Sequence, residues 1–250
     1  MTDEPIIRVS KLNAGYGDDI VLENISFDVL RGEIFAILGG SGCGKSTLMR
    51  HMVGLDRPQS GSVVVDGIDI ANCPAVDYHR VLRKIGVLFQ SSALFGSMTL
   101  MENLLLPMAE YSGLPPADLE ALIRFKLGLV NLNGYERHLP SQLSGGMKKR
   151  AGLARALALS PAILFLDEPS AGLDPITSAE IDELVLHINR ATGTTLVIVT
   201  HEIASVFRLA QRVIFLDKGA RGIVAEGDPR HLRQHSANPL VRRFLQSKTP

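Results

Sequence analysis

The sequence predicts an α/β fold with a core of parallel strands, an antiparallel β subdomain at the N-terminus and an inserted helical subdomain. Three observations lead to this prediction. Short apolar runs alternate with helical segments, as at 34–38 and 162–166, which is typical of a buried parallel sheet. A glycine-rich loop separates the first run from a helix. Residues 91–159 then change to helical periodicity, which indicates an insertion into the core.

The N-terminal β subdomain is predicted from three segments. Residues 6–13 and 20–29 have β-type patterns, and 61–67 has the pattern of a strand that ends in an Asp-Gly turn and pairs with them. Tyr16 lies in the glycine-flanked turn between the first two strands. Its ring either packs on its own turn or stacks on an adenine base, a contact worth roughly 1–3 kcal/mol. We predict stacking.

The glycine-rich loop has the pattern Gly-x-x-x-x-Gly-Lys-Ser between the strand at 34–38 and a helix that begins near 48. This context predicts a phosphate-binding loop for a nucleoside triphosphate, with backbone N–H groups pointing at phosphate oxygens. A glycine-rich turn with a chance Lys-Ser is the alternative. We expect Lys45 to reach the β- and γ-phosphates and Ser46 to bind magnesium. The nucleotide-binding residues predicted here are Gly39, Gly40, Ser41, Gly42, Cys43, Gly44, Lys45, Ser46 and Thr47, with Cys43 filling a variable position.

Two acidic residues end the apolar strand at 162–166. Asp167 suits a magnesium role together with the serine of the phosphate loop. Glu168 lies one residue further on, where a carboxylate can polarise a water in line with the γ-phosphate. The alternative is that these are two surface acids that only end the strand. The phosphate loop earlier in the chain disfavours this interpretation.

Two further polar side chains follow predicted core strands. After a helix at 75–84, Gln90 ends the strand at 85–89, where an amide can contact both the metal and the attacking water. His201 follows the strand at 194–200. A lone histidine is usually structural, but the carboxyl ends of strands in an open α/β sheet face the crevice where ligands bind. We therefore place both residues in the predicted active site.

The inserted subdomain ends in a second glycine-containing motif. Ser144 is a good N-cap for the helix that follows. Together with Gly145 and Gly146 it also offers exposed amides and a helix dipole, so the motif is predicted to bind a second anion. The helices expected in this part of the chain span 100–111, 118–130 and 148–159.

The C-terminal part continues the α/β pattern. A tight loop at 170–174 leads through Asp174 into a helix over 176–190. A hairpin, a short helix from 228 and an amphipathic segment at 239–245 follow, and the last of these docks either on its own domain or on a partner. As one ATP-binding domain, the chain divides into an α/β core with β subdomain (1–90 and 160–226), a helical subdomain (91–159) and a tail (227–250).

The composition narrows the class of protein. The 26 basic and 26 acidic residues cancel, so nothing in the charge indicates a nucleic-acid partner. The two cysteines suggest a reducing, cytoplasmic environment. No apolar run reaches the length of a membrane span, and the first residues do not have the pattern of a signal peptide. We expect any membrane role to come through a partner.

Taken in order, these motifs resemble those of the nucleotide-binding subunit of ABC transporters, over nearly the whole chain. The resemblance implies an ATPase that uses ATP and Mg²⁺, forms a head-to-tail dimer with a second copy of itself and couples to an integral membrane permease at the inner face of the cell membrane. It implies catalytic roles for Glu168, His201 and Gln90 and magnesium contacts from Ser46, Gln90 and Asp167. The matching motifs are the adenine loop at Tyr16, the Walker A loop at 39–47, the Q-loop at Gln90, the signature at 143–147, Walker B at Asp167 and Glu168, the D-loop at 170–174 and the switch His201.

A narrower resemblance concerns the cargo. The segments 143–150 and 93–99 look like the Mla branch, which implies phospholipid transport across a Gram-negative envelope with an MCE-domain lipid-binding protein and a small cytosolic regulatory subunit. The alternatives are a small-solute importer and a non-transporting complex such as a division-type regulator. Met147 departs from the common signature, which has glutamine there, so any polar contact from this position is in doubt. With Ser144, Gly145 and Gly146 intact, we expect hydrolysis to be retained.

Overall fold

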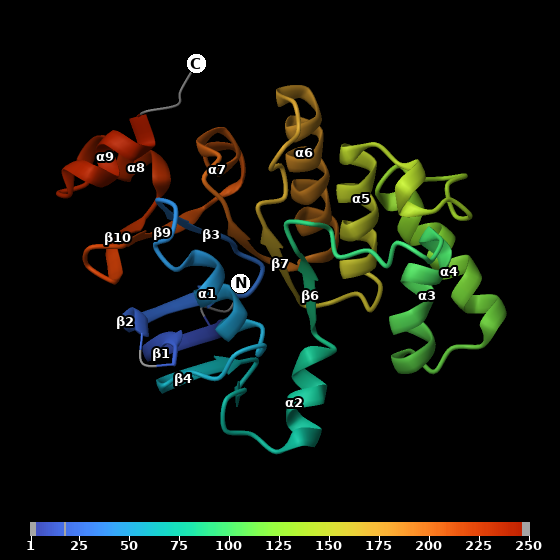
Figure 1. The fold of residues 1–250 in the computed structure, drawn as a ribbon, viewed down its shortest axis with the longest axis horizontal. Coiled ribbons are helices and arrows are strands. Elements are labelled where there is room, and N and C mark those ends of the chain that lie inside the picture. Colours follow the sequence, from blue (N-terminus) through green and yellow to red (C-terminus); the bar gives the residue numbers. More distant parts are fainter. Residues whose placement is uncertain (1–3, 18, 247–250) are drawn as a thin grey trace.

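Two β-sheets form the framework of the chain in the computed structural model, which describes residues 4–17 and 19–246. The larger sheet has the strand order β10-β9-β3-β8-β7-β6 (Figure 1). Within this sheet, the adjacent strands from β9 to β6 are parallel to one another, and β10 pairs antiparallel with β9. The strands of this sheet are β3 (Ile34–Gly39), β6 (Ile85–Leu88), β7 (Ile163–Asp167), β8 (Thr195–Val199), β9 (Arg212–Asp217) and β10 (Gly222–Gly227).

The smaller sheet is antiparallel, with the order β2-β1-β4-β5. In its register, Ile7 lies opposite Val29 on one side and Val65 on the other. This confirms the predicted N-terminal β subdomain. Its strands are β1 (Pro5–Tyr16), β2 (Asp19–Leu30), β4 (Ser60–Val65) and β5 (Ile68–Asp69).

Strand β3 supplies side chains to two hydrophobic cores because successive side chains of a strand point to opposite faces. Phe35 and Ile37 face the core shared with the small sheet, α1 (Lys45–Met52) and α2 (Ala75–Leu82). Ile34 and Leu38 belong to the second core, which the helices that follow β6 in the sequence cover. The ring of Phe35 stacks on Phe27 of β2 with centroids 5.3 Å apart, so the two sheets are packed directly against each other. The loop after β3 is therefore attached to a strand that is buried on both faces.

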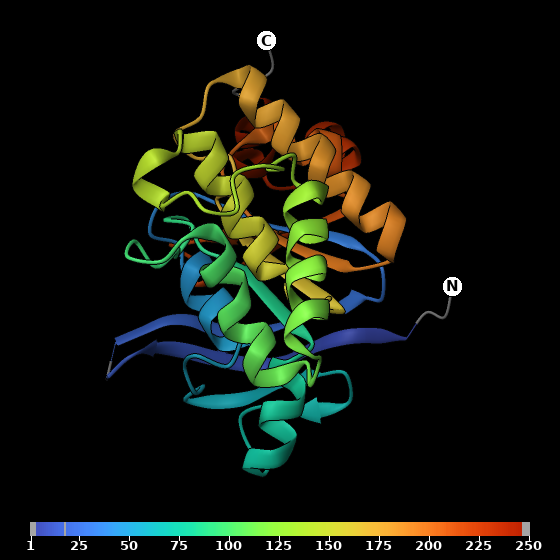
Figure 2. The same cartoon turned by 90° about the vertical axis from the view of Figure 1, so that its right-hand side faces the viewer.

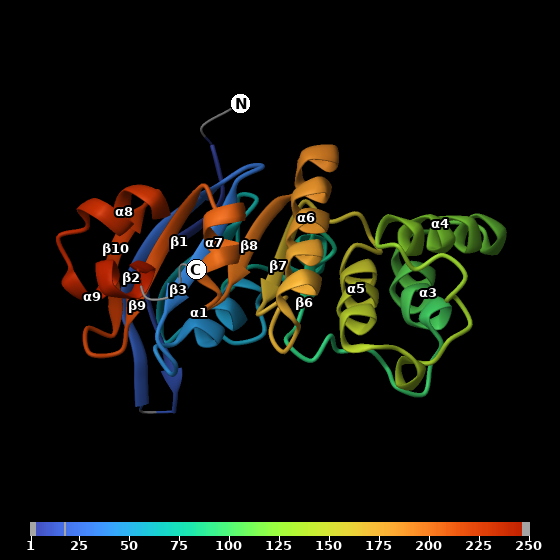
Figure 3. The ribbon, with the colours of Figure 1, turned by 90° about the horizontal axis from the view of Figure 1, so that it is seen from above.

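The helices cover the large sheet and extend beyond its β6 edge. Figures 1 and 3 show α3, α4 and α5 as a group beyond β6, and Figure 2 shows them in front of the sheet. None of the helices among residues 4–17 and 19–246 is both long and apolar enough to span a bilayer. The helices are α1 (Lys45–Met52), α2 (Ala75–Leu82), α3 (Leu100–Tyr111), α4 (Pro116–Leu129), 3-10 helix η1 (Pro140–Gln142), α5 (Gly145–Ala156), α6 (Pro175–Thr192), α7 (Ile203–Leu209), α8 (Pro229–His235) and α9 (Pro239–Gln246).

The structure differs from the expected elements at several boundaries. Helix α5 begins at Gly145 rather than at 148, because the Ser144 side chain accepts a hydrogen bond from the Met147 N–H and so caps the helix. Helix α7 was not expected; its N-cap residue, Glu202, makes no side-chain capping bond. Strand β5 was also missed, since two residues show no periodicity.

Two ion pairs connect the Asp66-Gly67 turn after β4 to neighbouring segments of the chain. The Asp66 carboxylate pairs with the Arg31 guanidinium at 2.7 Å and with the Lys84 ammonium. The hydrogen bonds from Lys84 and Arg31 lower the pKa of Asp66. Asp66 has a φ of 48°, a left-handed conformation that asparagine also tolerates.

The variant Asp66→Asn is expected to lower the free energy of unfolding at neutral pH by up to about 1 kcal/mol, because both cations lose their partner. A carboxyl with a lowered folded pKa stabilises above its unfolded value of about 3.9 and loses that contribution as the pH falls through the folded pKa. Urea unfolding of both proteins at several pH values should therefore show a difference that vanishes in acid. A difference that is constant over the acid range would contradict this role.

Candidate active site

The loop between β3 and α1 folds around its own lysine. Lys45 Nζ donates hydrogen bonds to the carbonyl oxygens of Gly39 and Gly40, both at 2.9 Å. Gly39 has a φ of 150°, and a Cβ there would lie 2.4 Å from the carbonyl oxygen of Leu216. Gly44 has a φ of 95°, and its Cβ would meet the side chain of Leu22 at 2.8 Å. Both positions require glycine, so the predicted pattern has a steric basis here.

The other members of the loop differ in exposure. Ser41, Gly42 and Ser46 are exposed, whereas Cys43 is buried. Burial raises the pKa of the Cys43 thiol, which keeps it protonated and unreactive at neutral pH. This agrees with its interpretation as a filler position. The side chain of Tyr16 lies outside the described residues, so its stacking on adenine stays a prediction.

Strands β7 and β8 bring Glu168 and His201 together. Asp167 and Val199 are register partners at the ends of these parallel strands, so the residues that follow them meet at one edge of the sheet. His201 Nδ1 lies 2.7 Å from Glu168 Oε1, and Thr200 Oγ1 donates to Glu168 Oε2 at 3.2 Å. Both carboxylate oxygens of Glu168 are thereby held.

The backbone of Glu168 adds to this constraint. Its φ is 47° and its side chain is largely buried. A non-glycine residue in the left-handed region costs on the order of 1–3 kcal/mol and persists only where the surroundings enforce it. The Glu168 N–H donates to the carbonyl of Val199 at 2.8 Å, which fixes the peptide before it. Such strain is typical of a functional position.

The environment of Asp167 disfavours its negative charge, so a nearby cation would stabilise its carboxylate. Burial and repulsion from Glu168 raise its pKa, while Lys149 and Lys45 lower it. A magnesium ion would supply the missing positive charge, and the Asp167 carboxylate, the Ser46 hydroxyl and the Gln90 amide oxygen are the hard ligands that Mg²⁺ prefers. The described residues contain no group of three His, Cys, Asp or Glu side chains suited to a metal. An ion held by Asp167, Ser46 and Gln90 would take its remaining ligands from phosphate oxygens and water.

Lys149 is a site residue that the sequence did not reveal. It belongs to α5 and is 6% exposed. Its Nζ donates to the carbonyl oxygens of Gln90 at 2.7 Å and of Glu168 at 3.0 Å. Burial lowers the pKa of Lys149, and Asp167 and Glu168 oppose that effect. Thr200 was also missed. The sequence does not show the contacts of either residue, because both contacts join segments that are distant in the chain.

The second glycine motif packs against the first turn of α6 and the loop that precedes it. A Cβ on Gly146 would lie 2.7 Å from Thr177, and one on Gly145 would lie 3.6 Å from Leu173. Asp174 caps α6, accepting from the N–H groups of residues 176 and 177 at 3.0 Å. Figures 1 and 3 show α5 and α1 on opposite sides of β7 and α6. Within one chain, the helix that Ser144 caps and the helix that follows the phosphate loop are therefore separated by β7 and α6.

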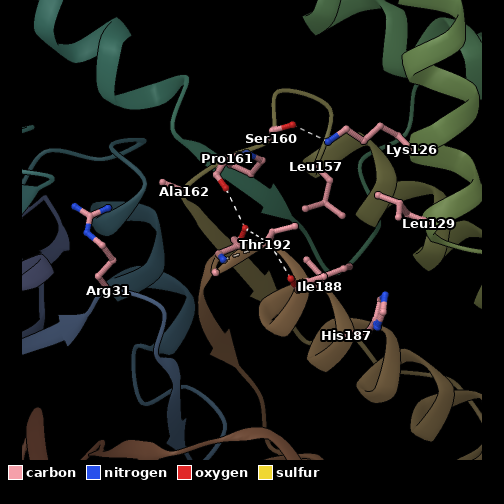
Figure 4. Close-up of a pocket in the computed structure, with 13 residues that line it drawn as sticks. Arg31, Lys126, Leu129, Leu157, Ser160, Pro161, Ala162, His187, Ile188 and Thr192 are labelled. Carbon is pink, nitrogen blue, oxygen red and sulfur yellow. Dashed lines mark hydrogen bonds between the residues drawn. The ribbon is translucent and has the colours of Figure 1, made fainter. Parts of the chain in front are cut away.

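A cavity of about 380 Å³ lies away from these residues, between α4, the end of α5 and α6 (Figure 4). Its lining includes Ala162 and Thr194, which precede β7 and β8, so it opens at the opposite edge of the sheet from Asp167 and His201. Lys126 reaches Ser160 Oγ at 2.7 Å beside this cavity. None of the predicted site residues lines it.

Comparison with known proteins identifies relatives over the full chain. The family model described as "ABC transporter" matches residues 22–171. A probable ribonucleotide transport ATP-binding protein of Mycobacterium leprae is 38% identical, over 97% of this chain and 69% of that protein. A methionine import ATP-binding protein of Brucella abortus is 38% identical, over all of this chain and 67% of that protein.

Solved structures give the same result for the fold. A dimeric post-hydrolysis structure of the ATP-binding cassette MJ0796, bound to ADP and Pi, superposes with a TM-score of 0.80 at 31% identity and covers 89% of this chain and 98% of that one. The structure of cbiO1 of Clostridium perfringens, which is part of the ABC transporter complex cbiONQ, has a TM-score of 0.83 at 31% identity over 92% of this chain and 90% of that one. The fold class predicted from the sequence is confirmed.

Proposed function

The chain belongs to the ABC transporter family and is an ATP-hydrolysing transporter subunit, and we propose that each ATP is hydrolysed between two copies of it arranged head to tail. Each ATP would contact the phosphate loop of one copy and Ser144, Gly145 and Gly146 of the other. The positions of α1 and α5 on opposite sides of β7 and α6 support this arrangement (Figure 3). The dimeric structures of MJ0796 also support it.

Within one chain, the phosphate loop binds the triphosphate. The backbone N–H groups of residues 39–47 and the partial charge at the start of α1 attract phosphate oxygens. Lys45 exchanges its bonds with the carbonyls of Gly39 and Gly40 for bonds to the β- and γ-phosphates. A bound Mg²⁺, held by Ser46, Asp167 and Gln90, would neutralise phosphate charge.

Glu168 is the proposed general base. Its carboxylate accepts a proton from a water whose oxygen attacks the γ-phosphorus, while the bond from that phosphorus to the β-phosphate oxygen breaks and ADP leaves. His201 and Thr200 orient the carboxylate through the two bonds described above. Gln90 positions the water and Asp174 borders the partner's nucleotide. The main support for this role is the contact of 2.7 Å between Glu168 and His201 at the carboxyl ends of β7 and β8.

For the cargo we propose phospholipid. The support is the segment 143–150, with Met147 and Lys149 in the signature helix, together with 93–99, both of which resemble the Mla branch. Under this proposal the chain works at the inner face of the cell membrane, through an integral permease and with an MCE-domain lipid-binding protein and a small regulatory subunit. The names of the relatives favour a second candidate, an importer of a small polar solute such as a nucleotide or methionine.

A pull-down distinguishes the two cargo classes. The tagged chain is expected to retain, from detergent-solubilised membranes, a permease, an MCE-domain protein and phospholipid, all identified by mass spectrometry. The matched control is the same preparation from untagged cells. A different permease without enriched lipid, accompanied by a periplasmic solute-binding protein, would contradict the phospholipid proposal and support import of a small solute.

A further inference from the structure

Three successive turns of helix α5 contact β6 or the segment that follows it. At the first, Lys149 binds the carbonyl of Gln90. At the next, a Cβ on Gly152 would lie 2.8 Å from the Leu88 side chain and 2.9 Å from the Ser92 Cβ, so the helix and the segment are in direct contact. Glycine is what permits this close approach.

The third contact is made by Arg155. Its guanidinium donates to the carbonyl of Ala93 and lies 4.8 Å from the centre of the Phe95 ring. Ser92 and Ala93 have φ values of 64° and 48°, which cost energy unless neighbouring contacts enforce them. The segment 90–95 is therefore held in a strained conformation by α5.

Lys149 connects this segment to Glu168. Its ammonium group donates one hydrogen bond to the carbonyl oxygen of Gln90, at 2.7 Å, and another to that of Glu168, at 3.0 Å. The Glu168 bond fixes the peptide that follows the strained residue, while the bond to Val199 fixes the peptide before it. The Glu168 carbonyl also accepts from the Ala171 N–H at 3.1 Å. Without Lys149, this carbonyl keeps only the bond within its own turn, and the left-handed backbone loses the one restraint that joins it to α5.

We propose that Lys149 is a positioning residue for hydrolysis, which sets the Glu168 carboxylate relative to Gln90 and transmits any displacement of segment 90–95 to it. This inference rests on the general-base role proposed above for Glu168. Among the described residues, the hydrogen bonds of the Lys149 ammonium group go to these two main-chain oxygens, so it acts through the position of Glu168. A displacement of α5 relative to the sheet then changes turnover without touching the nucleotide.

The test is Lys149→Met, which keeps the length of the side chain and removes its donors. The expected result is a fall of about 10- to 100-fold in kcat for ATP, as for a small misplacement of a catalytic group, with the ATP dissociation constant unchanged within about twofold. Lys149→Arg, which retains donors, should recover part of the loss. The control is Lys126→Met, which removes another buried lysine with a lowered pKa, and its kcat should match that of the wild type.

A double-mutant cycle separates the possible failures. In the Glu168→Gln background, Lys149→Met should cause no further loss, since the group that it positions is already absent. If Glu168→Gln lowers kcat but Lys149→Met does not, or if the two losses multiply, the positioning role is wrong. If Glu168→Gln itself leaves kcat unchanged, the proposed general base is wrong instead. Equal thermal midpoints for the methionine and arginine variants show that folding is not the cause of the difference.

Discussion

Glu168→Gln is expected to lower kcat for ATP hydrolysis on the order of 10²–10⁴-fold, the range typical of a lost general base. Glutamine keeps the size of the side chain and can still accept from Thr200 and face His201, but its amide does not take a proton from water. The KM for ATP should change little, because Glu168 contributes no phosphate contact in this account. Steady-state phosphate release measures both constants.

The matched control for this variant is Glu120→Gln. Glu120 is an exposed carboxylate on α4 that pairs with Arg124 at 2.8 Å, and exposed pairs of this kind contribute little. Its kcat should remain at the wild-type value. A Glu168→Gln enzyme that retains most of its turnover would show that another group activates the water.

Lys45→Met is expected to weaken ATP binding about 100-fold, because roughly 3 kcal/mol of charge-assisted bonds to phosphate is lost. Folding should be unaffected, since Lys45 Nζ bonds within its own loop, to the carbonyls of Gly39 and Gly40 and weakly to Cys43 Sγ at 4.0 Å, and is only partly buried. Equilibrium binding of a fluorescent ATP analogue and thermal unfolding without nucleotide provide the two readings.

Lys218→Met serves as the control for the loss of a positive charge, since Lys218 is exposed in the turn between β9 and β10. It should bind the analogue like the wild type. Unchanged affinity in Lys45→Met would contradict the phosphate role, and a lower thermal midpoint would indicate that the lysine is needed for the fold of the loop.

The sequence was sufficient for the framework and for residues that end strands. The apolar runs at 34–38 and 162–166 are short, and β3 and β7 agree with them to within one residue at each end. Glu168 and His201 could be placed at one edge because parallel strands end together. The domain boundaries and the assigned roles of the site residues remain predictions.

Long-range contacts account for most of what was missed. In the run Lys148-Lys149-Arg150, nothing distinguishes the buried lysine from its neighbours, and only the packing of α5 against β6 shows which one faces inward. The left-handed backbone of Glu168 was equally hidden, since glutamate does not favour it.

The shared site between two copies is the central claim, and Ser144 provides its most direct test. Ser144→Asp and Ser144→Asn both keep a good N-cap for α5, and they differ in one negative charge that would face the partner's γ-phosphate. Each is combined with Glu168→Gln and studied by sedimentation velocity in excess ATP. The account predicts that the asparagine variant forms an ATP-bound dimer, while the aspartate variant binds ATP with equal affinity but remains monomeric. Dimers of equal stability from both variants would contradict it.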